Sequence, residues 1–247
     1  MTSDTNKYTA VKPYNESETK TSQLSRMFNN ISKRYDAFNG IMTWGMVKIW
    51  RKKALKSLKK HNPKFMLDIA TGTGDVAIQA YKYLNPNKVT GIDISDKMLD
   101  IARKKAAKAN LDIQFEVQDS ANLKFTDSSF DAVTISFGIR NFEKLDQSIH
   151  EIHRVLKTEG HFMILEMNEP NHKLLLPAYK IYTKLFVWLS SRMLSNDTKA
   201  YDYLQNSMHV FASGNELIEI IEPVGFELER YNTFGLGVCS LYVFSKR

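Results

Sequence analysis

The sequence predicts an α/β protein built on a parallel, doubly wound sheet. The main observation is an alternation of short apolar runs, typical of buried strands, with longer segments whose apolar residues recur every three or four positions. A second observation is the glycine-containing turn TGTGD at the exit of the first apolar run, where sheets of this class bind ligands. Hydrophobic residues make up 43% of the 247 positions, which is enough for one sizeable core.

The elements follow in order along the chain. A helix is expected over residues 22–36, where the apolar side chains have helical spacing, and a basic helix follows it. Strands are then expected at residues 65–70, 89–93, 113–117, 132–136 and 162–166. Helices are expected between or after them, at residues 76–84, 97–109, 145–156 and 216–223. Two late strands, at residues 226–231 and 238–244, close the sheet.

The chain divides into an arm and one domain. Residues 1–20 have few apolar anchors and are expected to form a flexible arm, whereas residues 21–247 form a single domain. Residues 168–212 interrupt the strand–helix alternation with helical sequence, which predicts an inserted helical cap. The single cysteine, Cys239, excludes an internal disulfide and lies in an apolar run, as expected for a core residue of a cytosolic protein.

The net charge of +7 is concentrated in residues 48–64, which hold eight lysines and arginines and no acid. Val47, Trp50, Ala54 and Leu58 form an apolar stripe beside these charges. The pattern fits a helix that binds anionic lipid or nucleic acid, or a solvated helix face. The apolar stretch at residues 174–194 contains charges that disqualify it as a bilayer span. It fits a core helix, a lid over an apolar substrate, or a helix on a membrane surface.

The turn LDIATGTGD contains Gly72 and Gly74, which allow a ligand to approach the backbone closely. Nineteen residues after Gly74, the second strand ends at Asp93, which can accept hydrogen bonds from both ribose hydroxyls of a nucleoside ligand. A nicotinamide dinucleotide is one such ligand, because Ala77 completes a loose G-x-G-x-x-A pattern. A short-chain dehydrogenase, however, would need a Tyr-x-x-x-Lys pair after the fourth strand, and this spacing occurs only near the chain ends.

The run D-x-A-x-G-x-G, which begins at Asp68, resembles the first motif of S-adenosylmethionine-dependent methyltransferases with a seven-stranded Rossmann-like sheet. This resemblance implies S-adenosylmethionine as the cofactor and places Asp68 in the network around its methionine amino group. It also places Asp119 and Ser120, which follow the third strand, at the adenine. The cofactor-binding residues that we expect in full are Asp68, Gly72, Thr73, Gly74, Asp93, Asp119, Ser120 and Ser136.

Three further stretches carry a more specific resemblance. SFGIRNF (136–142) is similar to the signature of the ubiquinone/menaquinone biosynthesis C-methyltransferase family, known as UbiE or MenG. YDAFNGIMTWGMVKIW (35–50) resembles the N-terminal signature of that family, and RVLKTEGHFMILEMN (154–168) resembles its second signature. The resemblance extends from about residue 11 to residue 247.

This resemblance implies methyl transfer to a ring carbon of a polyprenylated quinol, namely a demethylmenaquinol in menaquinone biosynthesis. A methoxy-polyprenyl benzoquinol in ubiquinone biosynthesis is the alternative acceptor. A ring carbon becomes nucleophilic when the adjacent hydroxyl ionises; a guanidinium favours the phenolate and an amide orients it. Arg140 and Asn141 are therefore the candidate catalytic residues, with Asp36 as a candidate proton acceptor. Pairing of Arg140 with a structural carboxylate remains the alternative.

The single cysteine suits a cytoplasmic protein, and the basic helix at residues 48–64 with the helical region at residues 174–194 predicts peripheral binding to the inner face of the cytoplasmic membrane. A homodimer is left open. No metal is expected. No nucleic-acid partner is expected either, because the chain lacks the Asn/Asp-Pro-Pro-aromatic run of enzymes that methylate amines of nucleic acids. A non-catalytic membrane- or RNA-binding module is a remoter alternative. The intact residues Asp68, Gly72, Gly74 and Asp93 argue against it.

Overall fold

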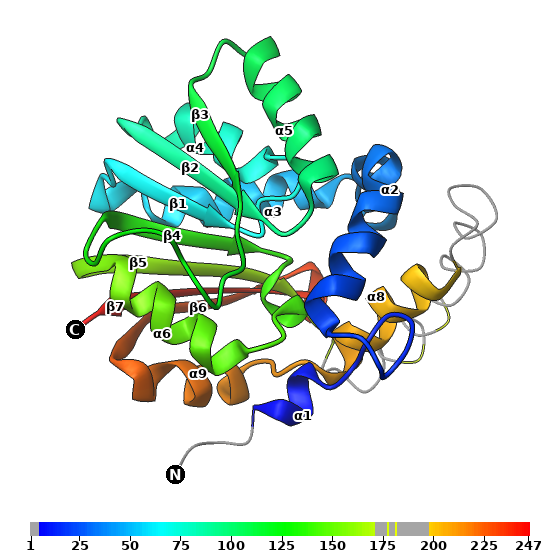
Figure 1. Cartoon of the computed structure of the whole chain (residues 1–247). Coiled ribbons are helices and arrows are strands. Elements are labelled where there is room, and N and C mark those ends of the chain that lie inside the picture. Colours follow the sequence, from blue (N-terminus) through cyan, green and yellow to red (C-terminus); the bar gives the residue numbers. More distant parts are fainter. Residues whose placement is uncertain (1–4, 171–176, 178–180, 182–197) are drawn as a thin grey trace.

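The computed structural model of the chain describes residues 5–170, 177, 181 and 198–247. Its centre is a seven-stranded sheet with the strand order β3-β2-β1-β4-β5-β7-β6 (Figure 1). The strands are β1 (Phe65–Ile69), β2 (Lys88–Asp93), β3 (Ile113–Val117), β4 (Phe130–Ser136), β5 (Leu156–Met167), β6 (Phe226–Phe234) and β7 (Cys239–Lys246). All seven strands predicted from the sequence are confirmed.

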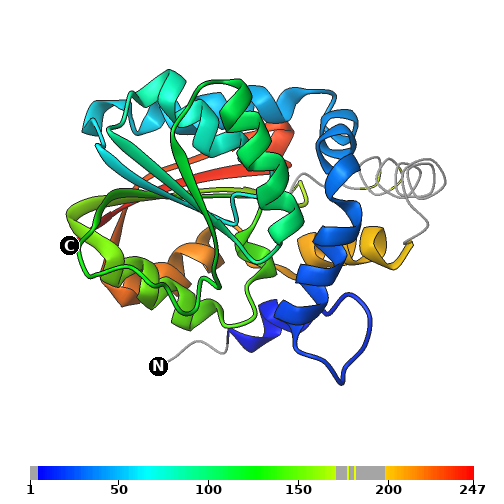
Figure 2. The same cartoon turned by 45° about the horizontal axis from the view of Figure 1, so that its top comes forward.

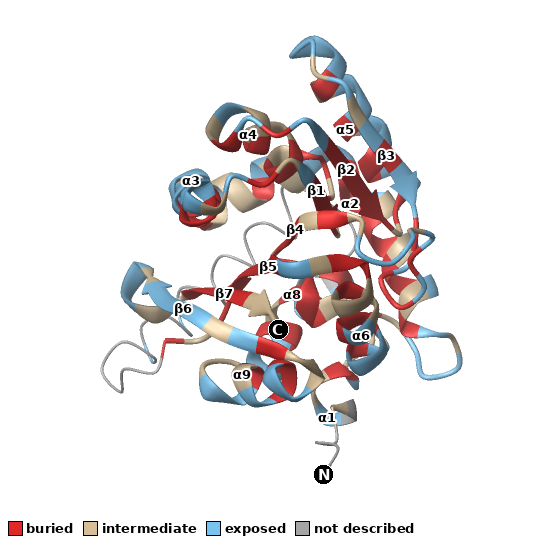
Figure 3. Ribbon diagram, turned by 90° about the vertical axis from the view of Figure 1, so that its left-hand side faces the viewer, coloured by how far each residue is buried: buried red, intermediate tan, exposed pale blue. Residues whose placement is uncertain are grey.

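The first five strands pair in parallel, and β7 runs antiparallel to both of its neighbours, β5 and β6. Met66 and Leu67, which are consecutive in β1, belong to two different buried clusters. Both faces of the sheet are therefore covered, which explains why the inner strands read as nearly continuous apolar runs. Figure 3 shows these strands as buried, whereas β6 is largely exposed.

Helices cover the two faces of the sheet (Figures 1 and 2). One face packs against α3 (Met46–Ser57), α4 (Asp75–Leu84) and α5 (Asp96–Lys108). The other packs against α6 (Leu145–Val155) and α9 (Asn215–Ile221). The helix α4 begins directly after the glycine turn, as the strand–helix alternation predicts.

Two further helices lie together at the edge of the sheet where the parallel strands end (Figures 1 and 2). They are α2 (Lys20–Met42) and α8 (Thr198–Val210), and they share an apolar cluster that includes Leu24, Phe28 and Tyr203. Thr19 caps the start of α2, because its side chain accepts a hydrogen bond from the backbone N–H of Ser22 at 3.3 Å. These two helices cover the carboxyl ends of the parallel strands, which is where ligands bind to sheets of this kind.

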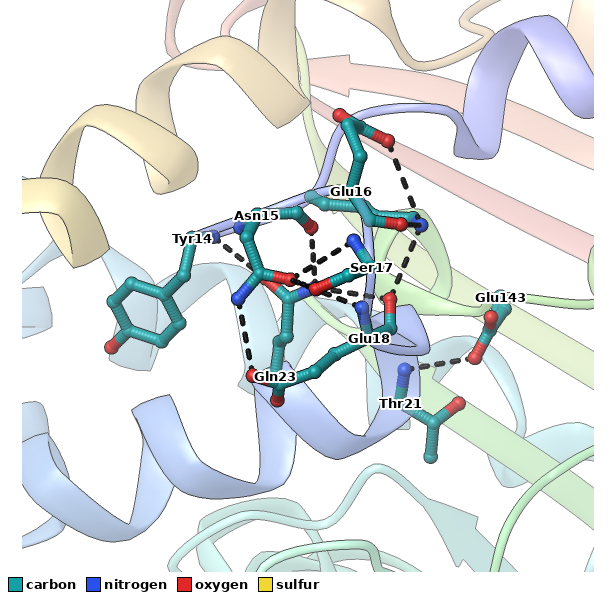
Figure 4. Close-up of polar contacts among 9 residues, drawn as sticks. Tyr14, Asn15, Glu16, Ser17, Glu18, Thr21, Gln23 and Glu143 are labelled. Atoms are coloured by element: carbon teal, nitrogen blue, oxygen red, sulfur yellow. Dashed lines mark hydrogen bonds and ion pairs between the residues drawn. The ribbon is translucent and has the colours of Figure 1, made fainter.

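The N-terminal arm has more structure than its composition suggests. After the short helix α1 (Asn6–Thr9), the chain forms a hydrogen-bonded loop around Gln23 of α2 (Figure 4). The side-chain oxygen of Gln23 accepts hydrogen bonds from the backbone N–H groups of Tyr14, at 2.7 Å, and Asn15, at 3.0 Å. The N–H of Thr21 donates to Glu143, which links the start of α2 to the loop after β4. The expectation of a flexible arm over residues 1–20 did not anticipate these contacts.

The basic helix is shorter than the predicted range 48–64: α3 ends at Ser57 and is followed by the short helix η1 (Lys59–His61). Its apolar stripe is buried against the sheet, so this stripe is not available to a membrane. The predicted helix at residues 174–194 lies outside the described residues, apart from residues 177 and 181. Among the helices that the structure describes, none is long and apolar enough to span a bilayer.

Candidate active site

A cavity of about 870 Å³ lies at the carboxyl ends of β1, β2 and β4, beneath α2. The structure brings most of the predicted site residues together here. Asp68, Gly72, Thr73, Asp93, Asp119, Ser120, Ser136 and Asn141 all line the cavity. Of the other predicted cofactor residues, Gly74 does not line it and instead precedes the first residue of α4.

The glycine turn has the backbone conformation that its sequence suggests. Gly72 and Gly74 have φ values of 56° and 79°, which favour glycine, and a Cβ atom at Gly74 would lie 2.8 Å from that of Ala102. The N–H of Gly72 donates a hydrogen bond of 2.8 Å to the carboxylate of Asp93. The turn is thereby fixed to the end of β2, with its backbone facing the cavity.

Two buried carboxylates face the cavity. Asp68 accepts hydrogen bonds from the hydroxyls of Thr71 and Thr134, each at 2.6 Å, and burial raises its pKa to about 6. Asp93 accepts from the N–H groups of Gly72 and Ser95, and burial raises its pKa to about 6 as well. Both carboxylates would be stabilised in the charged form by a ligand that brings a cation or hydroxyl donors.

The other wall carries polar groups suited to a nucleoside. Ser136 Oγ is buried and has no hydrogen-bond partner among the described residues, which a ligand polar group would satisfy. Ser120 Oγ lies 2.9 Å from Ser148 Oγ, and the side chain of Asp119 accepts from the N–H of Ala121. The unpaired Ser136 and the two carboxylates together fit a ligand with an ammonium group and ribose hydroxyls.

A second cavity, of about 400 Å³, adjoins the first. Tyr35 and Phe137 line both cavities and so form the wall between them. Phe137 has a φ of 61°, an unfavourable conformation for an aromatic residue, directly after β4. The remaining lining of the second cavity comes from α2, α3, β5, α8 and the loop after β4, and it is mostly apolar: Phe38, Asn39, Met42, Thr43, Val47, Arg140, Met167, Leu204 and Met208.

Among the residues that the structure describes, Arg140 is the one charged residue in the lining of the second cavity. Its guanidinium forms a buried ion pair with Glu166 of β5 and donates to the carbonyl of Phe137 at 2.9 Å. Its Nε is buried and has no hydrogen-bond partner among the described residues. Burial alone would lower the pKa of Arg140, but the Glu166 carboxylate raises it, so the guanidinium stays charged. Arg140 thus pairs with a structural carboxylate, as the alternative to a catalytic role supposes. It also keeps one donor, Nε, that no described residue uses.

Asn141 and Asp36 occupy different surroundings. Asn141 lines the first cavity, and its side-chain oxygen accepts a hydrogen bond of 3.0 Å from the hydroxyl of Tyr203. Asp36, in contrast, lines neither cavity. Its carboxylate accepts from Thr73 Oγ1 at 2.6 Å and pairs with Lys105 Nζ at 2.6 Å, which joins α2 to the glycine turn.

Sequence reasoning missed Arg51, which lines the first cavity. Its guanidinium pairs with Asp75 at 2.6 Å and lies 5.6 Å from the ring centroid of Phe137. The signal was present, because residues 47, 51, 54 and 58 follow helical spacing and place Arg51 on the buried stripe of α3. Glu166, by contrast, reaches Arg140 from a separate strand, and no local pattern predicts that pairing.

Comparison with known proteins agrees with this geometry. Residues 16–246 match the ubiE/COQ5 methyltransferase family. The chain belongs to that family. A demethylmenaquinone methyltransferase of Bacteroides fragilis is 39% identical, over 96% of this chain and 97% of its own. One of Porphyromonas gingivalis is 36% identical, over 94% and 96%. Family membership confirms the resemblance found in the motifs and makes the chain a methyltransferase, with S-adenosylmethionine as its cofactor.

Solved structures confirm the fold of this methyltransferase. The [4+2]-cyclase SpnF superimposes with a TM-score of 0.68 at 14% identity, over 96% of this chain and 99% of its own. A SAM-dependent methyltransferase of Aquifex aeolicus gives a TM-score of 0.55 at 17% identity, over 74% and 82%. At these identities the likeness shows the Rossmann-like fold alone.

Proposed function

We propose that this chain methylates a ring carbon of a polyprenylated quinol and that its acceptor is a demethylmenaquinol. The observation that carries the proposal is the apolar cavity beside the cofactor-sized one, with the guanidinium of Arg140 in its wall. Demethylmenaquinone methyltransferases that align over nearly the whole chain support the same acceptor. An apolar ring with one ionisable oxygen suits a cavity of this composition.

The first cavity offers the groups that S-adenosylmethionine needs. Asp93 would accept from the ribose hydroxyls, and Asp68, held by two threonine hydroxyls, would face the ammonium of the methionine moiety. Asp119 and Ser120 would lie along the adenine, and Ser136 Oγ would gain a partner. Bound there, the cofactor supplies an electrophilic methyl group on its sulfonium.

The second cavity would orient and activate the acceptor. The Nε of Arg140 is a buried donor that can bind the quinol oxygen and stabilise its charge as the ring carbon becomes nucleophilic. The side chain of Asn141, fixed by Tyr203, can position the same oxygen. Phe137 and Tyr35 lie where the ring would approach the cofactor, so they would set the alignment between ring carbon and methyl group.

A reconstituted assay tests the acceptor. Purified chain is incubated with S-adenosylmethionine and a reduced demethylmenaquinone with a short prenyl tail, and the product is measured by mass spectrometry. A methoxy-polyprenyl benzoquinol is assayed in parallel, a reaction without S-adenosylmethionine is the blank, and the Asp93→Ala variant serves as the control with weakened cofactor binding. Methylation of the benzoquinol at a higher kcat/KM would replace the proposed acceptor, and no methylation of either quinol would refute the proposal.

We also propose that the chain works at the surface of an anionic membrane, on the cytoplasmic side. The turn formed by the end of α2 and the residues before α3 exposes apolar side chains, with Trp44 80% and Ile41 59% exposed. Lys48 and Lys52 of α3 are exposed close to them in the chain. This turn and the first residues of α3 also supply Met42, Thr43 and Val47 to the second cavity, so a polyprenylated acceptor could enter from the bilayer.

Vesicle co-sedimentation tests this membrane surface. Trp44→Ser should reduce binding to anionic vesicles by about tenfold or more, because an exposed indole would otherwise be buried in the interface. Replacing Lys48 and Lys52 by Gln should reduce it roughly 30-fold, at about 1 kcal/mol for each lysine near the surface. Val117→Ser removes an exposed apolar side chain on β3 and should change nothing. Equal binding by all variants would contradict this surface.

A further inference from the structure

Two histidines and a glutamate meet at the edge of the sheet opposite the cavities. His61 ends η1, just before β1, His161 lies in β5, and Glu229 lies in β6. His161 is level with the start of β4, because it lies beside Ala132, whereas Ser136 at the other end of β4 lines the cofactor cavity. Four residues of strand separate the two levels, or about 13 Å. The cluster is therefore not part of the methyl-transfer site.

The three side chains have the spacing of metal ligands. His161 Nε2 lies 3.0 Å from one carboxylate oxygen of Glu229, and His61 Nε2 lies 3.4 Å from the other. One ligand atom from each residue can be chosen so that all three lie within 4.8 Å of one another. Zinc binds imidazole nitrogen and carboxylate oxygen at about 2.0–2.2 Å, so neighbouring ligands of a tetrahedral ion are about 3.3–3.5 Å apart. Little rearrangement would be needed to bind such an ion.

The two histidine rings are in contact, with centroids 3.4 Å apart and planes tilted by 34° to each other. His61 Nε2 is buried and makes no hydrogen bond within the described part of the chain. A buried ring nitrogen that makes no hydrogen bond is available to bind a metal ion.

One cation competes for the carboxylate. Lys60 Nζ lies 3.3 Å from Glu229, but its side chain is 63% exposed, so solvent screens the pair and the ammonium can move away at little cost. Glu229 itself lies at the register shift between Leu228 and Arg230, as the extra residue of a β-bulge. An open cavity of about 1220 Å³ adjoins the cluster and leaves room for a water molecule as the fourth ligand.

We propose that His61, His161 and Glu229 form a structural site for a divalent transition-metal ion, with Zn²⁺ as the ion to test. Imidazole and carboxylate ligands suit such ions, whereas Mg²⁺ prefers oxygen ligands alone. The ion would connect η1 to β5 and β6, and so tie the end of the helical N-terminal region to the last part of the sheet. Its effect would be on folding stability, because no ligand lines either cavity of the methyl-transfer site.

Metal titration of the tag-free full chain tests the site. Isothermal calorimetry with ZnCl₂ should show one ion bound per chain. The Tm of thermal unfolding should rise by about 5–10 °C when the free Zn²⁺ concentration is 100-fold above Kd. Mg²⁺ should give no shift. Co²⁺ should give the visible absorption of a four-coordinate ion that has nitrogen and oxygen ligands.

Variants assign the ligands. His61→Ala, His161→Gln and Glu229→Gln should each weaken zinc binding at least tenfold, because each removes one of three protein ligands. His150→Ala removes an exposed histidine on α6 and is the matched control, with unchanged binding expected. Circular dichroism and binding of S-adenosylmethionine show which variants are folded, and Glu229→Gln is the mildest change. Failure of the wild type to bind Zn²⁺, or equal binding by the folded variants, would overturn the proposal.

Discussion

The buried pair between Arg140 and Glu166 provides the most informative test of the site. The side chains of Arg140 and Glu166 are only 6% and 4% exposed. Arg140→Met would leave the Glu166 carboxylate buried without its cation, at a cost of about 3–5 kcal/mol in the free energy of unfolding. For a chain of this length, that cost corresponds to a fall in Tm of about 6–20 °C. A loss of activity in this variant alone therefore cannot distinguish catalysis from stability.

A second substitution separates the two effects. In Arg140→Met/Glu166→Gln no unpaired charge remains, and the glutamine oxygen can still accept from the N–H of Met167, so most of the lost Tm should return. If Arg140 stabilises the quinolate, the methylation rate of the double variant should stay about 10²–10³-fold below wild type. Its affinity for S-adenosylmethionine should be unchanged, because Arg140 does not line the cofactor cavity.

The assay measures Tm, cofactor affinity and a pH–rate profile for the wild type, the single variant and the double variant. Higher pH should partly rescue the rate of both variants, because the quinol then ionises without help. A double variant that recovers both Tm and rate would refute the catalytic role and leave Arg140 as the structural partner of Glu166. A double variant that loses cofactor affinity in proportion to rate would refute it as well.

Four further outcomes are expected. Asp93→Asn should weaken binding of S-adenosylmethionine by about 1–3 kcal/mol in calorimetry, the range for a lost partner in a buried polar site, and equal affinity would remove Asp93 from the site. Wild-type affinity should fall as the pH drops through about 6, where Asp68 and Asp93 take up protons, and the fall should be shallower in Asp93→Asn. The same raised pKa values mean that the free energy of unfolding of the cofactor-free protein should fall as the pH rises from about 4 to 6. In that range the folded state binds more protons than the unfolded chain. Gly138→Ala should lower the free energy of unfolding by about 1–3 kcal/mol, since its Cβ would lie 2.5 Å from that of Ala70. Gly40→Ala, in open space on α2, should raise it by about 0.5–1 kcal/mol. Denaturant titration of both variants checks the difference.

Much of the fold could be predicted because its signals are local. The strand β3 has the predicted bounds, and the glycine turn with Asp93 has the predicted geometry, because turn chemistry and apolar periodicity are encoded by neighbouring residues. The arm is different, since Gln23 fixes Tyr14 and Asn15 through contacts that composition does not report. Composition predicts only whether a segment can build its own core.

The site was predictable to the extent that motifs mark it. Asp68, Asp93 and Ser136 line the cavity as the cofactor motifs require. The contacts around Arg140 could not be predicted, because Glu166 and Tyr35 come from separate elements that only the folded chain brings together. The basic helix shows the same limit: its apolar stripe was correctly recognised, but only the structure shows that the core already covers it.

The strand order has a consequence for how the protein is made. Within the described sheet, β6 pairs only with β7, yet a ribosome synthesises β6 first. Until β7 has been synthesised, β6 has no strand to pair with, and the edge of β5 that later pairs with β7 is also unpaired. Unpaired strands of this kind invite association between chains. The residues Glu227, Glu229 and Arg230 place charges along β6, and such charges disfavour association between chains through this strand while it is unpaired.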